Sequence, residues 1–333
     1  MSCQRGQYVT AAVVTAGAIS GAYYAYRWYQ ENATKIPEQW TQVGTLKDIY
    51  AYPVKSCGPV IMNKAELSIL GLKDGWLRDR FLMVVDEKNN FVTARAYPEM
   101  LLVHPSVKSS VLTLKHADME PVHVNLAEVV TNQCAKTARV WGVEVPVFDC
   151  GHETSEWISR ILDKSSNNFR LVYYASHGAR TLRAGTSKIY RFTKNDTGAL
   201  PDEVPFNLVN QASVDDLNTR LKETQVTPRN FRPNFVMKGG KAYDEDNWKF
   251  VKIGDNVFEI IKPCFRCILT TIDPETGVRN VNADPLETLK TYRQSTEPAA
   301  RRSAGSSPRM GVQMSLRSAP GGLVKLDDPI YVA

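Results

Sequence analysis

Short hydrophobic runs separated by turn residues fill the first half of this sequence, and they constrain its fold more than any other feature. Residues 80–86 and 91–94 flank the polar stretch 87–90, as the two arms of a hairpin flank their turn. Further short runs follow at 101–103, 111–114 and 122–126. Many short strands with regular punctuation favour a barrel or a sandwich over a doubly wound parallel sheet.

The second half adds helices to the strands. Apolar residues at helical spacing predict an amphipathic helix over 153–163, and helices are also expected from Ser213 and after Asp284. Strands are predicted at 45–53, 235–237, 249–253 and 257–261. Residues 297–322 are rich in Ala, Arg, Ser, Gly and Pro, which predicts either disorder or a long loop with one strand near 312–316. We therefore expect an α+β protein with a β core.

The string Lys262–Cys267 carries the clearest chemistry. It separates two runs rich in β-branched residues, of which the second is 268–272, so both Cys264 and Cys267 are expected on a turn between two strands. The lysine and arginine of the same string favour the thiolate, which is the form that binds metals and attacks electrophiles.

Three interpretations of these thiols follow from the residues alone. Structural zinc takes four Cys or His ligands, commonly as two spaced pairs, and the remaining cysteines at 3, 57, 134 and 150 supply no second pair. A thioredoxin-like dithiol usually opens a helix, whereas 268–272 is strand-like. The third interpretation is a pair of half-buried cysteines that pack as small hydrophobic side chains.

This corner resembles the cofactor loop of the MOSC-domain molybdenum proteins, specifically the family of mitochondrial amidoxime reducing components. Four other strings are similar to that family in the same order, namely Tyr52–Cys57, Gly71–Phe81, Asn230–Asn234 and Pro285–Arg293. The resemblance extends from about residue 42 to the C-terminus, and five ordered motifs are far more specific than an isolated Cys-x-x-Cys. It implies a β-rich MOSC-associated domain at 42–165 and a barrel-centred MOSC domain at 166–333.

The same resemblance implies a molybdenum cofactor, held by the dithiolene of a molybdopterin and by one protein thiolate at the position of Cys267. A soft thiolate suits a metal that already has sulfur donors. The positions that match the family's cofactor contacts are Lys55, Ser56, Arg80, Arg232, Phe265 and Arg266. Four of these six residues are cations, which suits a phosphorylated, anionic cofactor.

Two positions depart from the family's pattern. Phe265 stands where the family often has a small hydroxyl residue, so a backbone contact is expected there. The stretch Asp202–Pro205 replaces an Asp-Thr-Ser-Pro sequence, and Asp202 is retained as an expected carboxylate of the substrate site.

The activity implied by the resemblance is the reduction of N-hydroxylated compounds such as amidoximes, N-hydroxyguanidines and hydroxylamines, with nitrite as a further candidate. The sequence has no dinucleotide fingerprint, so electrons are expected from partners, which the resemblance names as cytochrome b5 and NADH-cytochrome b5 reductase. The alternative is a MOSC-type protein that carries sulfur or the cofactor, or binds without turnover.

The N-terminus predicts a membrane anchor. No charged residue occurs from Tyr8 to Tyr26, and nineteen helical residues approach the thickness of a bilayer core. A short tail at 1–7, a transmembrane anchor at 8–28 and a linker at 29–41 are expected, although a cleaved signal peptide is the alternative. The resemblance implies the mitochondrial outer membrane, with the catalytic domain facing the cytosol. The net charge of +6 is mild and its cations are scattered, so no nucleic-acid partner is expected.

Overall fold

The computed structural model describes residues 35–333, apart from 132–133, 163–168, 183–188, 191 and 194–195. The chain divides into two compact units, Met1–Gln39 and Trp40–Ala333, and every described helix and strand belongs to the second. The anchor expected at 8–28 lies outside the described residues. In the part of the chain that the structure describes, no helix is both long enough and apolar enough to span a membrane.

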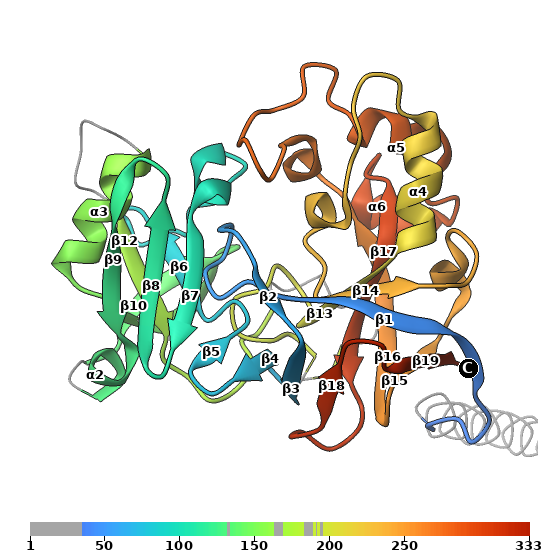
Figure 1. Ribbon diagram of the computed structural model, residues 1–333, viewed down its shortest axis with the longest axis horizontal. Coiled ribbons are helices and arrows are strands. Elements are labelled where there is room, and N and C mark those ends of the chain that lie inside the picture. Colours follow the sequence, from blue (N-terminus) through green and yellow to red (C-terminus); the bar gives the residue numbers. More distant parts are fainter. Residues whose placement is uncertain (1–34, 132–133, 163–168, 183–188, 191, 194–195) are drawn as a thin grey trace, which may run out of the picture. The chain divides into compact units, whose positions relative to one another are not determined.

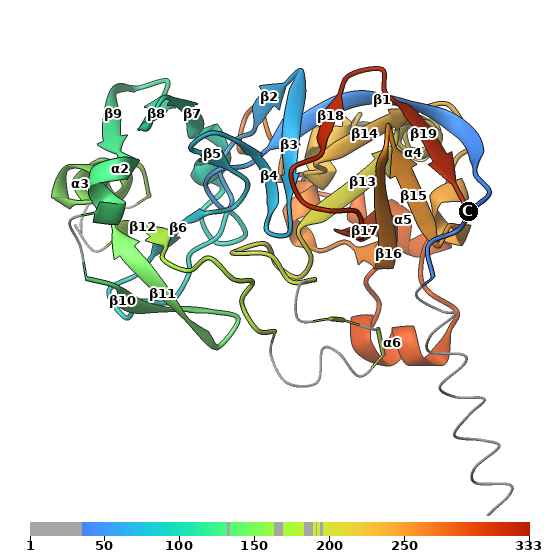
Figure 2. The same cartoon turned by 90° about the horizontal axis from the view of Figure 1, so that it is seen from below.

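Seven strands close into a barrel (Figure 2). The order around the barrel is β14, β13, β17, β16, β15, β19 and β1, and the pairing of β1 with β14 completes the ring. The strands are β1 (Thr41–Ala51), β13 (Phe206–Asn210), β14 (Phe235–Lys238), β15 (Phe250–Ile253), β16 (Asn256–Phe265), β17 (Arg309–Leu316) and β19 (Pro329–Val332). A closed sheet has no unpaired edge. The prediction of a barrel-centred fold is confirmed.

The barrel interior is filled by large side chains from alternate strand positions. Phe206, Phe235 and Phe258 are fully buried, and their ring centroids lie 5.2 to 5.8 Å apart. Such aromatic pairs add about 0.5–1.5 kcal/mol each beyond their area burial. The closed barrel therefore gives the loops at its ends a rigid support.

The described residues also form three smaller sheets (Figure 1). One contains β3 (Lys64–Ser68), β4 (Gly71–Asp74), β5 (Leu77–Arg78) and β18 (Leu323–Lys325). The second contains β6 (Leu82–Val85), β10 (Lys136–Val140), β11 (Val143–Asp149) and β12 (Arg170–Tyr174). The third contains β7 (His104–Lys108), β8 (Val111–His116) and β9 (Met119–Asn125), while β2 (Val60–Met62) pairs with β1.

The described helices are short. They are α2 (Leu126–Thr131), α3 (His152–Leu162), α4 (Gln211–Arg220), α5 (Leu286–Tyr292) and α6 (Pro298–Ala304), with 3-10 turns η1 (Pro98–Leu102), η3 (Pro228–Phe231), η4 (Asp244–Asn247) and η5 (Ile268–Thr271). The amphipathic helix predicted at 153–163 is confirmed as α3. Its Trp157 is buried and donates its indole N–H to the Glu120 carbonyl at 2.7 Å.

The strand predicted at 268–272 is wrong, because Ile268–Thr271 form the 3-10 turn η5 and Ile272 makes a single bridge with Arg279. The hydroxyl of Thr270 donates to the Cys267 carbonyl at 2.9 Å, and the hydroxyl of Thr271 donates to the Ile268 carbonyl at 2.8 Å. These local bonds offer the backbone an alternative to a sheet ladder. Strand β16 continues to Phe265, so Cys264 lies inside the strand, and only Cys267, which directly precedes η5, lies at the turn.

Other element predictions also need correction. Residues 101–103 were expected as a strand, but Pro98 begins the 3-10 turn η1 there. In the expected hairpin, 91–94 contributes a single bridge instead of a second strand. The helix expected from Ser213 begins earlier, because the Asn210 side chain caps it by accepting from the Ala212 N–H at 3.0 Å. The segment 297–322 contains α6 as well as strand β17.

Candidate functional site

One pocket of about 440 Å³ brings the expected site residues together. It is lined by residues of the barrel and of the segments that carry the smaller sheets. All eight residues selected from the sequence line it: Lys55, Ser56, Arg80, Asp202, Arg232, Phe265, Arg266 and Cys267. They come from five separate stretches of the chain, which only the folded structure places side by side.

The two thiols of the corner differ in environment. Cys264 is buried, and burial raises the pKa of its thiol; the Gln313 amide lies 3.6 Å from its sulfur. Cys267 is partly exposed and opens the turn η5. Since the thiolate is the form that binds metals, Cys267 is the better placed ligand. Within the described residues no cluster of three or more His, Cys, Asp or Glu side chains could hold a metal ion.

Lys55 and Asp202 form an ion pair at the pocket. Lys55 is buried, its Nζ also donates to the Leu200 carbonyl at 2.9 Å, and burial lowers its pKa to about 8. Burial opposes ionisation of Asp202, but Lys55 and Arg95 outweigh it and hold the pKa of Asp202 well below its usual range. The pocket therefore contains a carboxylate whose ionised form two cations stabilise.

Two further arginines of the pocket, Arg232 and Arg266, form no ion pair with a described carboxylate. Arg266 is buried and donates to backbone carbonyls, including that of Phe231 at 2.7 Å. The Arg232 guanidinium makes no hydrogen bond or ion pair with any described residue, and it lies 4.2 Å from the Tyr52 ring centroid. Burial lowers the pKa of Arg232 to about 10. Arg232 is half-buried and its positive charge has no described ion-pair partner, so this part of the pocket favours an anionic ligand.

Arg95 and Trp141 belong to the site although sequence reasoning did not select them. Arg95 donates through Nε to the Cys267 sulfur at 3.4 Å and through Nη2 to the Asp202 carboxylate at 2.6 Å. The Trp141 indole N–H donates to the same carboxylate at 3.1 Å, and the Arg95 guanidinium lies 5.1 Å from the Trp141 ring. Arg95 therefore links the expected metal ligand to the expected substrate-site carboxylate.

One signal for Trp141 was present in the sequence. Trp141 and Gly142 form the two-residue turn between β10 and β11, and both have positive φ, at 52° and 80°. Asn-Gly is the usual sequence in such a turn, so a bulky residue in its first position is unusual. No such signal marks Arg95, because its partners lie more than 100 residues away in the chain.

Ser56 and Phe265 also line the pocket. Ser56 is buried and has a left-handed backbone, with φ at 72°. Phe265 is the last residue of β16, and Lys262 lies 5.4 Å from its ring centroid. Lys262 in turn pairs with Glu203 at 2.6 Å, which fixes the stretch that replaces the family's Asp-Thr-Ser-Pro sequence.

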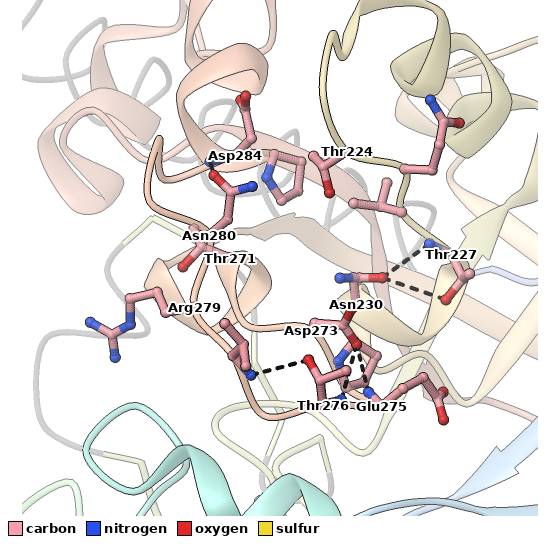
Figure 3. A pocket seen from close by; sticks show the side chains of 15 residues that line it. Thr224, Thr227, Asn230, Thr271, Asp273, Glu275, Thr276, Arg279, Asn280 and Asp284 are labelled. Carbon is pink, nitrogen blue, oxygen red and sulfur yellow. Dashed lines mark hydrogen bonds between the residues drawn. The ribbon is translucent and has the colours of Figure 1, made fainter.

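A second pocket, of about 280 Å³, is lined by residues that include Asn230 and Thr271 (Figure 3). Its side chains are mostly engaged in local turns. The Asp273 carboxylate accepts from the backbone N–H groups of Glu275 and Thr276, at 2.7 and 3.3 Å. None of the fifteen residues drawn in Figure 3 is a cysteine or a lysine. The chemistry of the thiol therefore belongs to the first pocket.

Comparison with known proteins identifies the class. Residues 43–165 match the MOSC N-terminal beta barrel domain, and residues 195–331 match the MOSC domain. Together with the closed barrel and the pocket around Cys267, these matches define a MOSC-domain protein.

Individual relatives define the family more closely. The chain is 38% identical over 320 residues to mitochondrial amidoxime-reducing component 1 of Homo sapiens, covering 96% of this chain and 92% of the human protein. It is 37% identical over 290 residues to mitochondrial amidoxime reducing component 2 of Bos taurus, covering 87% of this chain and 83% of the bovine protein. The chain belongs to the family of mitochondrial amidoxime reducing components. A solved structure of the YUAD protein from Bacillus subtilis is similar only remotely, with a TM-score of 0.35 and 10% identity over 88% of this chain and 98% of that one, and supports no argument here.

Proposed function

We propose that this protein is a molybdenum-dependent reductase of N-hydroxylated compounds, among them amidoximes, N-hydroxyguanidines and hydroxylamines. The observation that carries the proposal is the pairing of a partly exposed thiol, Cys267, with the unneutralised guanidinium of Arg232 in one pocket. The family relatives are named for amidoxime reduction, which supports the substrate class.

The residues of the pocket fit a molybdopterin cofactor by their chemistry. A phosphorylated pterin is an anion, and Arg232 offers a charge that no described residue satisfies. Arg266, Lys55 and Arg80 add three further cations to the same wall. Guanidinium groups bind phosphate oxygens in a bidentate fashion, and a thiolate is a soft ligand suited to molybdenum. Cys267 would bind the metal, while Ser56 and the backbone of Phe265 complete the shell.

The bound cofactor would supply the two-electron chemistry that removes the oxygen atom from nitrogen. The overall reaction consumes two electrons and two protons per N–OH group, and it releases water and the reduced amidine, guanidine or amine. The protein's own contribution is positioning and electrostatics. Three donors, from Lys55, Arg95 and Trp141, occupy the Asp202 carboxylate, which can accept about four hydrogen bonds. One acceptor position is left for an N–H or O–H group of the substrate.

Electrons have to reach this pocket from another protein in the proposed reaction. Cytochrome b5, reduced by NADH-cytochrome b5 reductase, is the donor that we propose. The apolar segment 8–28 would hold the protein in the mitochondrial outer membrane, with residues 42–165 and 166–333 as the two domains on the cytosolic side. The mitochondrial names of the relatives support the organelle.

The experiment that tests the proposal compares two cysteine variants. The full-length chain is purified from cells that make the cofactor, and the molybdenum and pterin content per chain is measured beside the turnover of an amidoxime. About one molybdenum per wild-type chain is expected, with loss of metal and activity in Cys267→Ala and retention of both in Cys264→Ala.

Each other outcome has a definite meaning. Loss of molybdenum in Cys264→Ala alone would show that the ligand assignment is wrong. Molybdenum without turnover would favour a carrier or binding protein, and zinc in place of molybdenum would favour a structural metal site.

A further inference from the structure

The motif Tyr52–Cys57 contains one residue whose burial the proposed reaction does not explain. Tyr52 is 1% exposed, and its hydroxyl has no hydrogen-bond partner among the described residues. Burying a hydroxyl without a partner costs stability, and phenylalanine would avoid that cost. The Tyr52 ring, however, lies against two guanidinium groups. The guanidinium carbon of Arg80 lies 4.6 Å from the ring centroid, and that of Arg232 lies 4.2 Å from it.

Both arginines are held by unusual backbone geometry. Arg80 and Arg232 have left-handed conformations, with φ at 50° and 49°. Residues other than glycine adopt this region in only a few per cent of cases, and such strain concentrates at functional sites. The Arg80 side chain is also linked to the Arg232 backbone, since Arg80 Nη2 donates to the Arg232 carbonyl at 3.1 Å.

The charges of the two arginines are not equally compensated. Arg80 Nη1 donates to the buried carboxylate of Asp79 at 2.6 Å, whereas the Arg232 side chain forms no ion pair with a described carboxylate. Burial lowers the pKa of Arg232, and repulsion from Arg80 contributes in the same direction. The face of an aromatic ring carries negative electrostatic potential and attracts cations that have lost water. A guanidinium also stacks on such a face through its planar shape.

Tyr52 is fixed to the same framework by its backbone. Its N–H donates to the Asp79 carboxylate at 2.7 Å, and its carbonyl accepts from the Arg80 N–H at 2.8 Å. Asp79 therefore holds the main chain of Tyr52 and the side chain of Arg80 at once. These bonds fix the backbone that carries the ring next to Arg80.

We propose that Tyr52 is the positioning residue of the anion-binding part of the pocket, and that its ring holds the Arg80 and Arg232 guanidinium groups ready for the phosphate of the ligand. The ring performs this function and the hydroxyl does not. The inference rests on the proposed function only for the identity of the ligand, because the pair of arginines would bind any phosphate-type anion.

The test uses full-length protein made in cells that cannot synthesise the cofactor, with inorganic pyrophosphate as the probe. Its affinity is measured calorimetrically for the wild type, Tyr52→Phe and Tyr52→Met. Methionine fills much of the volume of the ring but has no aromatic face. We expect Tyr52→Phe to bind as the wild type does, and Tyr52→Met to bind about tenfold more weakly. Tyr52→Leu is the second variant if the methionine protein does not fold.

Two controls separate positioning from general damage to the core. Phe235→Leu removes a fully buried ring that contacts neither arginine, and pyrophosphate affinity should be unchanged in its folded fraction. In an Arg232→Met background, the Tyr52→Met substitution should weaken binding less than it does in the wild type, because only the contact of the ring with Arg80 is then left to lose.

The proposal is wrong if Tyr52→Phe weakens binding as much as Tyr52→Met does, or if Tyr52→Met leaves affinity unchanged. It is also wrong if wild-type protein does not bind pyrophosphate at all. A parallel measurement of molybdenum in protein from cofactor-producing cells keeps the two hypotheses apart. Pyrophosphate binding that depends on the ring, in a chain that never acquires molybdenum, would support the role of Tyr52 and refute the reductase.

Discussion

Removing the Arg95 side chain tests the residue that contacts both the Cys267 thiol and the Asp202 carboxylate of the pocket. Arg95 bonds both to the Cys267 sulfur and to the Asp202 carboxylate, and its side chain is 24% exposed. Hydrogen bonds to charged groups contribute about 1.5–3 kcal/mol each. The bond to sulfur is long and the side chain is partly hydrated, so we expect the two together to contribute no more than one good bond. Arg95→Met should therefore lower kcat/KM by roughly 10- to 150-fold.

The assay follows reduction of an amidoxime by the molybdenum-loaded enzyme with a chemical reductant, so that docking of an electron-donating protein does not limit the rate. Molybdenum per chain is measured in the same samples. Arg95→Lys keeps the positive charge but cannot offer the planar fork that reaches two acceptors, so it should resemble Arg95→Met. Arg139→Met is the matched control, because Arg139 pairs only with exposed Glu144 on the neighbouring strand.

A kcat/KM of Arg95→Met within threefold of the wild type, with molybdenum content intact, would refute the reasoning. Full rescue by Arg95→Lys would show that charge alone matters and that the bidentate geometry does not. If Arg139→Met lost as much activity as Arg95→Met, the effect would be a general consequence of removing positive charge.

Two further predictions concern the folded protein without its ligand. Burial raises the pKa of Glu245 to about 7, so the native state keeps a proton that the unfolded state has released between about pH 4.5 and 7. Stability should then fall as pH rises through that interval, by up to about 3.5 kcal/mol at 1.4 kcal/mol per pKa unit, and Glu245→Gln should remove the difference between urea unfolding at pH 5 and at pH 8. An equal pH dependence in both proteins would contradict this. Mass spectrometry after brief alkylation should find Cys267 and the exposed Cys134 modified first. Burial raises the pKa of the other described thiols, which are Cys57, Cys150 and Cys264. Early labelling of any of those three buried thiols would contradict the structure.

Several strands of the barrel could be predicted from the residues alone, whereas the barrel itself followed from the family resemblance, because the residues left a barrel and a sandwich open. Short runs rich in apolar and β-branched residues are separated by turn residues, as Gly254 and Asp255 separate Phe250–Ile253 from Asn256–Phe265. The turn at 268–272 was mistaken for a strand because β-branched residues dominate it. Threonine hydroxyls that bond three residues back decide its conformation, and composition does not reveal them.

The residues of the site also divide into those that the sequence could indicate and those that it could not. Lys55, Arg232 and Cys267 lie in contiguous strings whose resemblance to a family could be recognised, and the fold gathers them in one pocket. Arg95 and Trp141 have no such string, because their roles depend on partners brought near only by tertiary structure. Tyr52 lay inside a recognised string, yet its relation to two arginines required coordinates.

The closure of the barrel has a consequence for how the protein is made. Strand β1 (Thr41–Ala51) pairs on one side with β14 (Phe235–Lys238) and on the other with β19 (Pro329–Val332). A ribosome synthesises β1 early and β19 late, so β1 emerges long before either neighbour exists. During that interval only Ile49–Ala51 can pair, with the neighbouring strand β2, and the rest of both edges is open, which invites aggregation. Folding of the barrel is therefore expected to be largely post-translational, and chaperones that shield strand edges should matter most for this first strand.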